Sequence, residues 1–271
     1  MISYDNNIIN AIKINITNNK YISKYFDFTY TSQKHKIECI LTEILKVIKY
    51  GIPWRLIENI PYTTVYSSYK RLLYFGILKN TYIDLLHLYL KKQPNKKLKY
   101  QYTDTTCVSN KYGSCHVAYN GYKMKKCSKI SFISETYGIP INVNINNGKK
   151  NDGKILVSHF HDMLINKKLN DKNKKYMLAD SIYYVNEVKN LLTNEGYEYI
   201  INPNRKNTKY KEIEKLTPKQ LKIYTKRIRI EHTNNILKTY RRLNCRYDRN
   251  LDTFYGSLWI ALIGIIIRKF N

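Results

Sequence analysis

The stretch Tyr100-Gln-Tyr-Thr-Asp-Thr-Thr106 marks the point at which the hydrophobic pattern of this chain changes. Before it, apolar residues recur at the spacing of helices. After it, short runs rich in β-branched and aromatic residues alternate with turn residues. Tyr100–Thr106, Ile130–Glu135 and Ile141–Ile145 are therefore predicted to form three strands of an antiparallel meander, with Tyr137-Gly138 and Asn146-Asn147-Gly148 as turns.

Helices and strands alternate in the remainder of the chain. The predicted elements are a helix over Gly153–Leu164, a strand over Lys175–Ala179, a helix over Val185–Glu195, a strand over Tyr197–Ile201 and a long helix that begins at Thr217-Pro218. The order βββαβαβα predicts an α/β fold, in which helices flank a mixed sheet.

The N-terminal part of the chain is predicted to be helical. Apolar residues at helical spacing predict one helix from His35 to Gly51, a second from Thr63 or Thr64 to Gly76, and a third from Tyr82 to Lys91. Short helices joined by tight turns suit a helix-turn-helix-like DNA-binding unit, and a plain helical bundle is the alternative. Residues 1 to about 30 are expected to form a loosely ordered arm or a short helix.

The basic stretch Lys91–Lys99 is interrupted by Pro94 and is predicted to be a linker. We therefore expect two domains: residues 1–95, a small all-α DNA-binding domain, and residues 96–271, which contain the mixed sheet.

The charge of the chain indicates a polyanionic partner. The 271 residues include 47 Lys and Arg against 20 Asp and Glu, a net charge of +27. Basic residues are spread along the whole chain, as in nucleic-acid-binding proteins, although an AT-rich coding sequence also favours lysine. The clusters Lys123–Lys126 and Arg241-Arg242 alternate with tyrosine, which stacks on bases.

The compartment is predicted from what the sequence lacks. The first twenty residues do not resemble a signal peptide, and the apolar run Leu258–Ile267 is about half of what a bilayer crossing needs. We expect an intracellular protein with no membrane partner and a buried C-terminal helix.

A zinc site can be drawn from Cys107, Cys115, His116 and Cys127. Their spacing matches no common zinc module, so scattered reduced thiols are favoured.

Three acids lie in or next to predicted elements of the sheet domain, at positions where active-site residues are often found. Asp104 lies inside the first predicted strand, Asp180 follows the strand Lys175–Ala179, and Glu231 lies in the long helix. If the two strands are neighbours, the three acids share one site, and their repulsion implies a bound divalent cation such as Mg²⁺. Taken singly, each acid has a structural alternative: Asp104 caps a turn, Asp180 begins a loop, and Glu231 pairs with Arg227 or Arg229.

Glu231 belongs to a stripe of polar residues on one helix face. Tyr224, Arg227, Glu231 and Lys238 fall within about 60° of one another if the segment is helical. A single acid therefore sits among cations, an arrangement suited to phosphate chemistry, in which basic groups hold the polyanion and an acid holds the metal.

The pattern Tyr224-x2-Arg227-x3-Glu231-x6-Lys238 resembles the signature of DDE transposases of bacterial insertion sequences, specifically the group numbered five within the insertion-sequence-four-like superfamily. The likeness covers about residues 35–270. Ile182 stands where the family usually has glycine, and Asn151 where it has histidine. Further matching segments are Asp104-Thr105, Asp180-Ser-Ile-Tyr183, the Gly148…Asn151-Asp152 turn, Arg241-Arg-Leu…Arg246-Tyr-Asp248, Gly51-Ile-Pro-Trp-Arg55 and Thr64-Val-Tyr66.

The resemblance implies a ribonuclease-H-like catalytic domain in which Asp104, Asp180 and Glu231 hold Mg²⁺, for which Mn²⁺ can substitute. It implies DNA cleavage at the ends of a mobile element and strand transfer into target DNA. The implied partners are double-stranded DNA, as terminal inverted repeats and as target, and a second copy of the chain when two ends are paired. The candidate DNA-binding residues are Arg227, Lys238, Tyr224, Tyr183, Arg241, Arg242 and Arg246.

Two other functions remain open on the sequence. One is a domesticated, non-catalytic DNA-binding protein, and the other is a metal-dependent nuclease of the same fold. In each case the protein is expected to act where DNA is, in the cytoplasm or nucleoid of a bacterial host, or otherwise in a nucleus or at a viral replication site.

Overall fold

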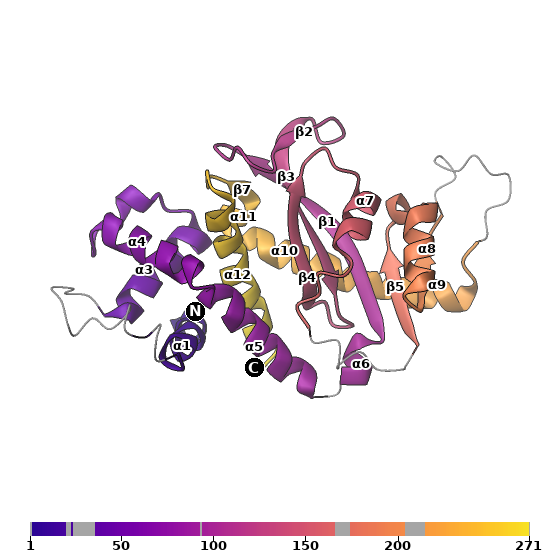
Figure 1. The fold of residues 1–271 in the computed structure, drawn as a ribbon, viewed down its shortest axis with the longest axis horizontal. Helices are drawn as coiled ribbons and strands as arrows, with labels where there is room; N and C mark the ends of the chain where they lie inside the picture. Colours follow the sequence, from indigo (N-terminus) through magenta and orange to yellow (C-terminus); the bar gives the residue numbers. More distant parts are fainter. Residues whose placement is uncertain are drawn as a thin grey trace. The chain divides into compact units, whose positions relative to one another are not determined.

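The computed structural model describes residues 2–19, 23, 36–92, 94–165, 174–203 and 215–270, which form two compact units (Figure 1). Unit 1 comprises Met1–Tyr89, Lys111–Cys115 and Ile236–Asn271, and unit 2 comprises Leu90–Asn110 and His116–Asn235. Unit 1 thus draws on both ends of the sequence, whereas the predicted domains 1–95 and 96–271 follow one another along the chain.

Unit 2 is built on a mixed sheet with the strand order β2-β3-β1-β5-β6, and β4 also pairs with β3. The pairs β1–β3, β2–β3 and β3–β4 are antiparallel, whereas β1–β5 and β5–β6 are parallel. The α/β class and the predicted meander are therefore confirmed. The strands are β1 (Tyr100–Asn110), β2 (Ala118–Asn120), β3 (Lys125–Ser134), β4 (Pro140–Asn147), β5 (Lys175–Ala179) and β6 (Tyr197–Ile201).

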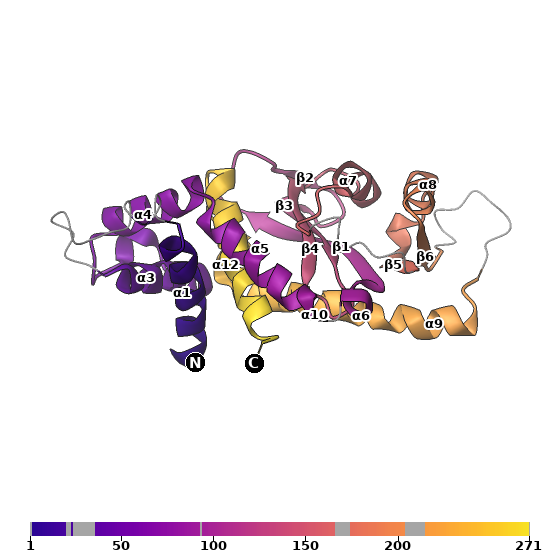
Figure 2. The same ribbon diagram turned by 60° about the horizontal axis from the view of Figure 1, so that its bottom comes forward.

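Helices cover both faces of this sheet (Figure 2). The short helices α7 and α8 lie on one side, and α9 with the first part of α10 lies on the other. Because of this cover, every residue of β3 from Cys127 to Ser134 is buried, as expected of a strand between two helical layers. The elements are α6 (Pro94–Leu98), α7 (Asp152–His159), α8 (Asn186–Asn194), α9 (Pro218–Tyr224) and α10 (Ile228–Thr239), with short 3₁₀ turns at Ser181–Tyr183 and Thr225–Arg227.

Most predicted elements of unit 2 are present, and the differences have local causes. Strands β5 and β6 have the predicted bounds. The predicted linker contains α6, which Pro94 opens at the first helical position, where proline is tolerated. The long helix predicted from Thr217-Pro218 is divided by a 3₁₀ turn at Thr225–Arg227, and Thr217 caps its start in a capping box with Gln220.

Unit 1 is a helical assembly around the apolar helix α12. This helix contacts α1, α3 and α4, and its side chains are buried from Phe254 to Ile267 except at Tyr255. The elements of unit 1 are α1 (Ile2–Thr17), α3 (Ile37–Tyr50), a 3₁₀ turn at Trp54–Leu56, α4 (Tyr62–Tyr74), α5 (Ile77–Lys91), α11 (Arg241–Asn244), β7 (Cys245–Arg246) and α12 (Leu251–Ile267).

The predicted N-terminal arm contains a longer helix than expected. Helix α1 buries Ile8, Ile12 and Ile16, which are four residues apart and therefore share one face. The part of the predicted arm at residues 24–30 lies outside the described residues. Within the described ranges, no helix is both long and apolar enough to cross a membrane.

Helices α4 and α12 of unit 1 approach each other closely at Gly256 of α12. The Tyr69 hydroxyl of α4 donates a 2.7 Å hydrogen bond to the Thr253 carbonyl oxygen. A Cβ added at Gly256 would overlap that hydroxyl and lie 2.5 Å from Leu73 Cδ2. Glycine is therefore the residue that allows α4 to approach α12.

We predict that Gly256→Ala lowers the free energy of unfolding by about 2 kcal/mol, because forcing extra atoms into a packed core costs about 1–3 kcal/mol. Urea denaturation followed by circular dichroism measures the change. Tyr69→Phe removes the nearest clashing atom, so the double variant should be less destabilised than the sum of the two single changes. Strict additivity would contradict this explanation.

Candidate functional site

Two predicted acids lie at the same level of the sheet in unit 2. The parallel strands β1 and β5 pair Tyr102 with Leu178, and Asp104 and Asp180 each follow two residues later. Asp104 lies in the middle of β1, just beyond the last residue that pairs with β5, and Asp180 directly follows β5. Both acids therefore lie where the parallel pairing ends and the carboxyl end of β5 opens, the usual location of sites in such sheets. The condition set by the sequence, that the two strands are neighbours, is therefore met.

Asp104 is half-buried and its carboxylate has an amide partner. Asn234 of α10 donates a 2.7 Å hydrogen bond from Nδ2 to Asp104 Oδ2. Burial raises the pKa of Asp104 to about 6, and the negative charges of Asp180 and Asp152 act in the same direction. The Thr105 backbone and the Arg227 guanidinium oppose the rise. Asp104 is thus a carboxyl group whose ionised form is disfavoured, chiefly by burial.

Glu231 is an exposed residue that is held by an ion pair. Arg227 Nη2 lies 2.6 Å from Glu231 Oε1, four residues along the helical segment. Burial raises the pKa of the neighbouring Tyr224, which the charges of Asp180 and Glu231 raise further and Arg227 lowers. Arg227 therefore contacts Glu231 directly and also acts electrostatically on Asp104.

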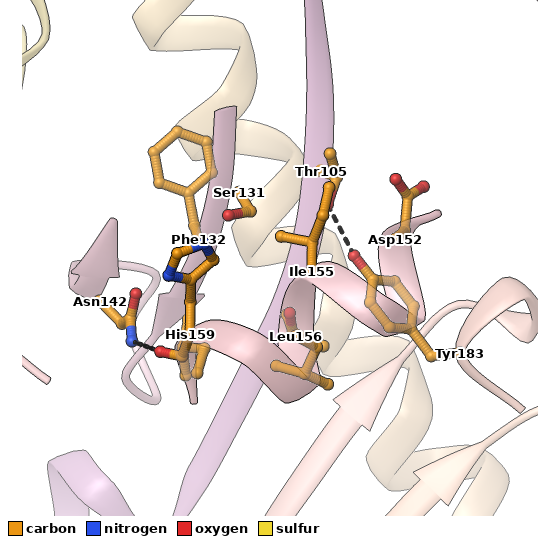
Figure 3. A pocket seen from close by; sticks show the side chains of 11 residues that line it. Thr105, Ser131, Phe132, Asn142, Asp152, Ile155, Leu156, His159 and Tyr183 are labelled. Atoms are coloured by element: carbon orange, nitrogen blue, oxygen red, sulfur yellow. Dashed lines mark hydrogen bonds between the residues drawn. The ribbon is translucent and has the colours of Figure 1, made fainter. Parts of the chain in front are cut away.

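Asp180 is exposed and forms the start of a 3₁₀ turn. Its Oδ1 accepts a 2.6 Å hydrogen bond from the Ser181 backbone N–H. At the other end of this turn, the buried Tyr183 hydroxyl lies 2.9 Å from Thr105 Oγ1, the residue after Asp104 (Figure 3). The turn that carries Asp180 is thereby tied to the strand that carries Asp104.

A small pocket lies under α7, on the face of the sheet that carries Thr105 (Figure 3). Its polar lining includes Thr105, Tyr183, Asp152 and His159. The Asp152 carboxylate is held by Lys129 of β3, whose Nζ lies 2.6 Å from Oδ1. This ion pair compensates a charge that would otherwise act fully on Asp104 and Tyr183.

The sequence predicts a divalent cation at this site, so the oxygen donors near Asp104 and Asp180 must suit such an ion. Within the described ranges, no group of three or more His, Cys, Asp or Glu side chains is placed to hold a metal ion. Asp104 and Asp180 nevertheless suit a hard divalent cation, because both are carboxylates that raise each other's energy when ionised. The amide oxygen Oδ1 of Asn234 is buried and has no hydrogen-bond partner in the described part of the chain, so another oxygen donor is available. Glu231 would first have to leave Arg227.

The predicted DNA-binding residues have different surroundings. Lys238 and Arg241 are exposed, and Arg227 and Tyr224 are half-buried. Arg242 is buried in unit 1, where Nη2 donates to the Ile52 carbonyl oxygen at 3.2 Å. Arg246 is fully buried and donates to the carbonyl oxygens of Cys115, Asp248 and Arg249. In this conformation Arg242, Arg246 and Tyr183 therefore support the structure rather than offer a surface to DNA.

Sequence reasoning missed Asn234 and Lys129 as members of the site. Asn234 lies three residues after Glu231, and this spacing places both on one side of α10. Helical spacing was thus a usable signal for Asn234. Lys129 gave no such signal, because its pairing with Asp152 depends on how α7 packs on β3.

Comparison with protein families gives a match to the transposase DDE domain over residues 95–265. This chain belongs to that family. Comparison with curated proteins gave no match.

Solved structures show weaker likenesses. A piggyBac transposase synaptic complex with hairpin DNA has a TM-score of 0.45 at 13% identity, over 99% of this chain and 65% of that chain. The catalytic domain of Mos1 mariner transposase has a TM-score of 0.29 at 10% identity, and the match covers 62% of this chain and 90% of that chain. A Mos1 transposase paired-end complex with the left transposon end has a TM-score of 0.28 at 8% identity, and the match covers 69% of this chain and 61% of that chain. The family assignment depends on the family match alone.

We predict that Asp104→Asn stabilises the metal-free protein at pH 7 by about 1–3 kcal/mol, since one pKa unit corresponds to about 1.4 kcal/mol. The folded-state pKa of about 6 lies above the ordinary aspartate value of 3.8, so the folded state binds the proton more tightly. Wild-type stability should accordingly fall as pH rises from about 4 to 6, and the advantage of Asn should vanish below pH 4.

Urea unfolding at several pH values in the presence of a chelator measures this difference. Glu187→Gln, at an exposed position of α8, is the matched control and should change little. A wild-type protein whose stability rises over the same pH interval relative to Asp104→Asn would contradict the prediction.

We predict that Tyr183→Phe lowers the free energy of unfolding by about 1 kcal/mol, because it leaves Thr105 Oγ1 without its tyrosine partner. Denaturant unfolding measures the loss, and Tyr176→Phe, at a half-buried tyrosine of β5, serves as control. Equal effects of the two substitutions would show that the Thr105 contact adds no stability.

Proposed function

We propose that this protein is a DNA transposase whose catalytic acids are Asp104, Asp180 and Glu231. The observation that carries the proposal is the parallel pairing of β1 with β5, in which Asp104 of β1 and Asp180, the residue after β5, each follow the paired residues Tyr102 and Leu178 by two positions, and burial raises the pKa of Asp104 to about 6. A transposase of this family needs carboxylates that gain from a divalent cation. Membership of the transposase DDE domain family and the mixed sheet flanked by helices, as in a ribonuclease-H-like fold, support the same function.

The proposed reaction has two phosphoryl transfers. In the first, water forms a bond to a phosphorus atom at the end of the element, and the phosphorus–oxygen bond to the 3′-oxygen breaks and releases a 3′-hydroxyl. In the second, that hydroxyl forms a bond to a target phosphorus atom, and a target 3′-oxygen leaves. Mg²⁺ or Mn²⁺ held by the three acids would activate the attacking oxygen and stabilise the leaving oxygen.

The residues around the acids have separate proposed tasks. Asn234 orients the Asp104 carboxylate through its 2.7 Å hydrogen bond. The Thr105–Tyr183 contact holds the Asp180 turn against β1. Arg227, already beside Glu231, is positioned to exchange that carboxylate for a DNA phosphate when Glu231 turns to the cation.

The remaining basic residues and partners complete the proposal. Lys238 and Arg241 are exposed and suit contacts to the DNA backbone, as do Lys70 and Arg71 of α4 in the proposed helix-turn-helix-like domain. Pairing two element ends requires at least two protomers, and inverted repeats with target DNA are the proposed substrates. The protein is proposed to act inside the cell wherever that DNA lies, and the insertion-sequence-five group remains our proposed placement.

The test uses the purified full chain and DNA from either side of its coding sequence, in which inverted repeats define the substrate. We predict that Asp104→Asn, Asp180→Asn and Glu231→Gln each lower end cleavage and strand transfer by at least about a hundredfold, since removing one electrostatic partner of a transition state costs about 10²–10³. Glu187→Gln should retain activity. A chelator should abolish both steps, and Mn²⁺ should restore them.

The outcomes separate the candidate functions. Cleavage without strand transfer would identify a nuclease, and specific binding without cleavage would identify a non-catalytic DNA-binding protein. Metal binding has an independent readout, because Mn²⁺ should raise the melting temperature of the wild type but not of Asp104→Asn. Normal cleavage by all three acid variants would overturn the proposal.

A further inference from the structure

The hairpin formed by β2 and β3 carries the two most exposed large apolar side chains that the structure describes in unit 2. Tyr122 is 91% exposed and Met124 is 78% exposed, and Tyr119 beside them is 55% exposed. All three lie at or next to the turn between Asn120 and Lys125 (Figure 1). Large apolar groups that gather at one exposed tip, rather than being scattered singly, indicate a binding surface.

The charge around this tip has one sign. Residues 105–134 contain five lysines and no aspartate or glutamate. Lys123, Lys125 and Lys126 are exposed, and none of them forms an ion pair with an acidic residue in the described ranges. The Lys123 ammonium group lies 5.4 Å from the centre of the Tyr122 ring. The tip therefore offers aromatic and cationic groups together, the combination that binds nucleic-acid bases and phosphates.

The conformation of the tip is fixed by hydrogen bonds. Asn120 Oδ1 accepts from the Lys123 backbone N–H at 2.9 Å, and Asn120 Nδ2 donates to the Gly148 carbonyl oxygen at 2.9 Å. Gly148 itself admits no side chain, since an added Cβ would overlap the Cys127 carbonyl oxygen. The base of the hairpin is thus anchored to the end of β4, and this anchoring reduces the entropy that the turn loses on binding.

Met124 is held in a backbone conformation that methionine seldom adopts. Its φ is +50°, in the left-handed region that favours glycine. A residue with a Cβ is retained there at some cost in stability. Since the side chain packs against little in the protein, its use is expected to lie outside the protein.

We propose that the tip residues Tyr122, Lys123, Met124 and Lys126 form a DNA-contacting surface that receives an unpaired or unstacked base. Tyr122 stacks on the face of the base, Met124 occupies the space between bases, and the two lysines contact flanking phosphates. This inference rests on the proposed function, because breaking and joining element ends exposes such bases. A second copy of the same tip is disfavoured as the partner, because the lysines of two tips would repel.

The test measures binding of the purified full chain to two fluorescent probes. One, the intact duplex, has an arbitrary sequence. The other, the gapped probe, is the same duplex with an internal unpaired stretch that contains 2-aminopurine. We expect Tyr122→Ala to weaken binding to the gapped probe about 5- to 150-fold, the range for one stacked base. Tyr122→Phe keeps the ring and should bind as the wild type does. Binding to the intact duplex should change much less.

Two further variants separate the roles of the other tip residues. Met124→Gly removes the side chain while relieving the left-handed backbone, so it should bind the gapped probe more weakly although it does not destabilise the fold. Lys123→Ala and Lys126→Ala should each reduce the slope of log affinity against log salt by about 0.7–0.9, the value for one lost phosphate contact. Lys174→Ala, at an exposed lysine paired with Glu198, is the control and should leave the slope unchanged.

The result that overturns the inference is equal affinity of Tyr122→Ala, Met124→Gly and wild type for the gapped probe, with no difference in 2-aminopurine fluorescence. If these variants also cleave element ends normally while Asp104→Asn does not, the proposed function stands and only the role of the hairpin fails. Concentration-dependent dimerisation that Tyr122→Ala abolishes, without an effect on DNA binding, would identify a second copy as the occupant and would likewise overturn the inference.

Discussion

The parallel pairing of β1 with β5 is the constraint on which the rest of unit 2 depends. Parallel strands require a crossover, and here the chain passes through β3, β4 and α7 before β5 joins the sheet. The pairing places Asp104 and Asp180 side by side although they are far apart in sequence. It also brings the turn after β5 close enough to β1 for Tyr183 to reach Thr105. An antiparallel β5 would place Asp180 towards the N-terminal end of β1, away from Asp104.

Two of the acids at or near the site are paired with basic residues, one on each face of the sheet. Arg227 pairs with Glu231 on the face covered by α10, and Lys129 pairs with Asp152 on the face covered by α7. Asp104 accepts a hydrogen bond from the amide of Asn234, and burial raises the pKa of Asp104 to about 6. Within the described residues the chain thus pairs Glu231 and Asp152 with basic side chains and leaves Asp104 and Asp180 without an ion pair. Such an arrangement stores unfavourable electrostatic energy at the position where a cation is most useful.

Local patterns predicted much of this fold. Alternation and turn residues located β5 and β6 with their observed bounds, and the helical period ending at Gly51 located α3. What local patterns omit is the partner of each element. The apolar run in α12 predicted burial but not its contacts with α1, α3 and α4. The family resemblance likewise made Arg242 and Arg246 candidates for DNA contact, whereas their burial beside backbone carbonyls depends on tertiary packing that a sequence window does not contain.

The composition of unit 1 from both ends of the chain has a consequence for synthesis. All of unit 2 precedes α12, so it leaves the ribosome before α12 does. Until then, helices α1, α3 and α4 lack the apolar helix against which they pack. Their apolar faces therefore stay exposed, and chaperones and proteases can bind them. A protein that folds in this order completes its N-terminal helices last. Any binding property that depends on those helices therefore appears only after translation has passed α12.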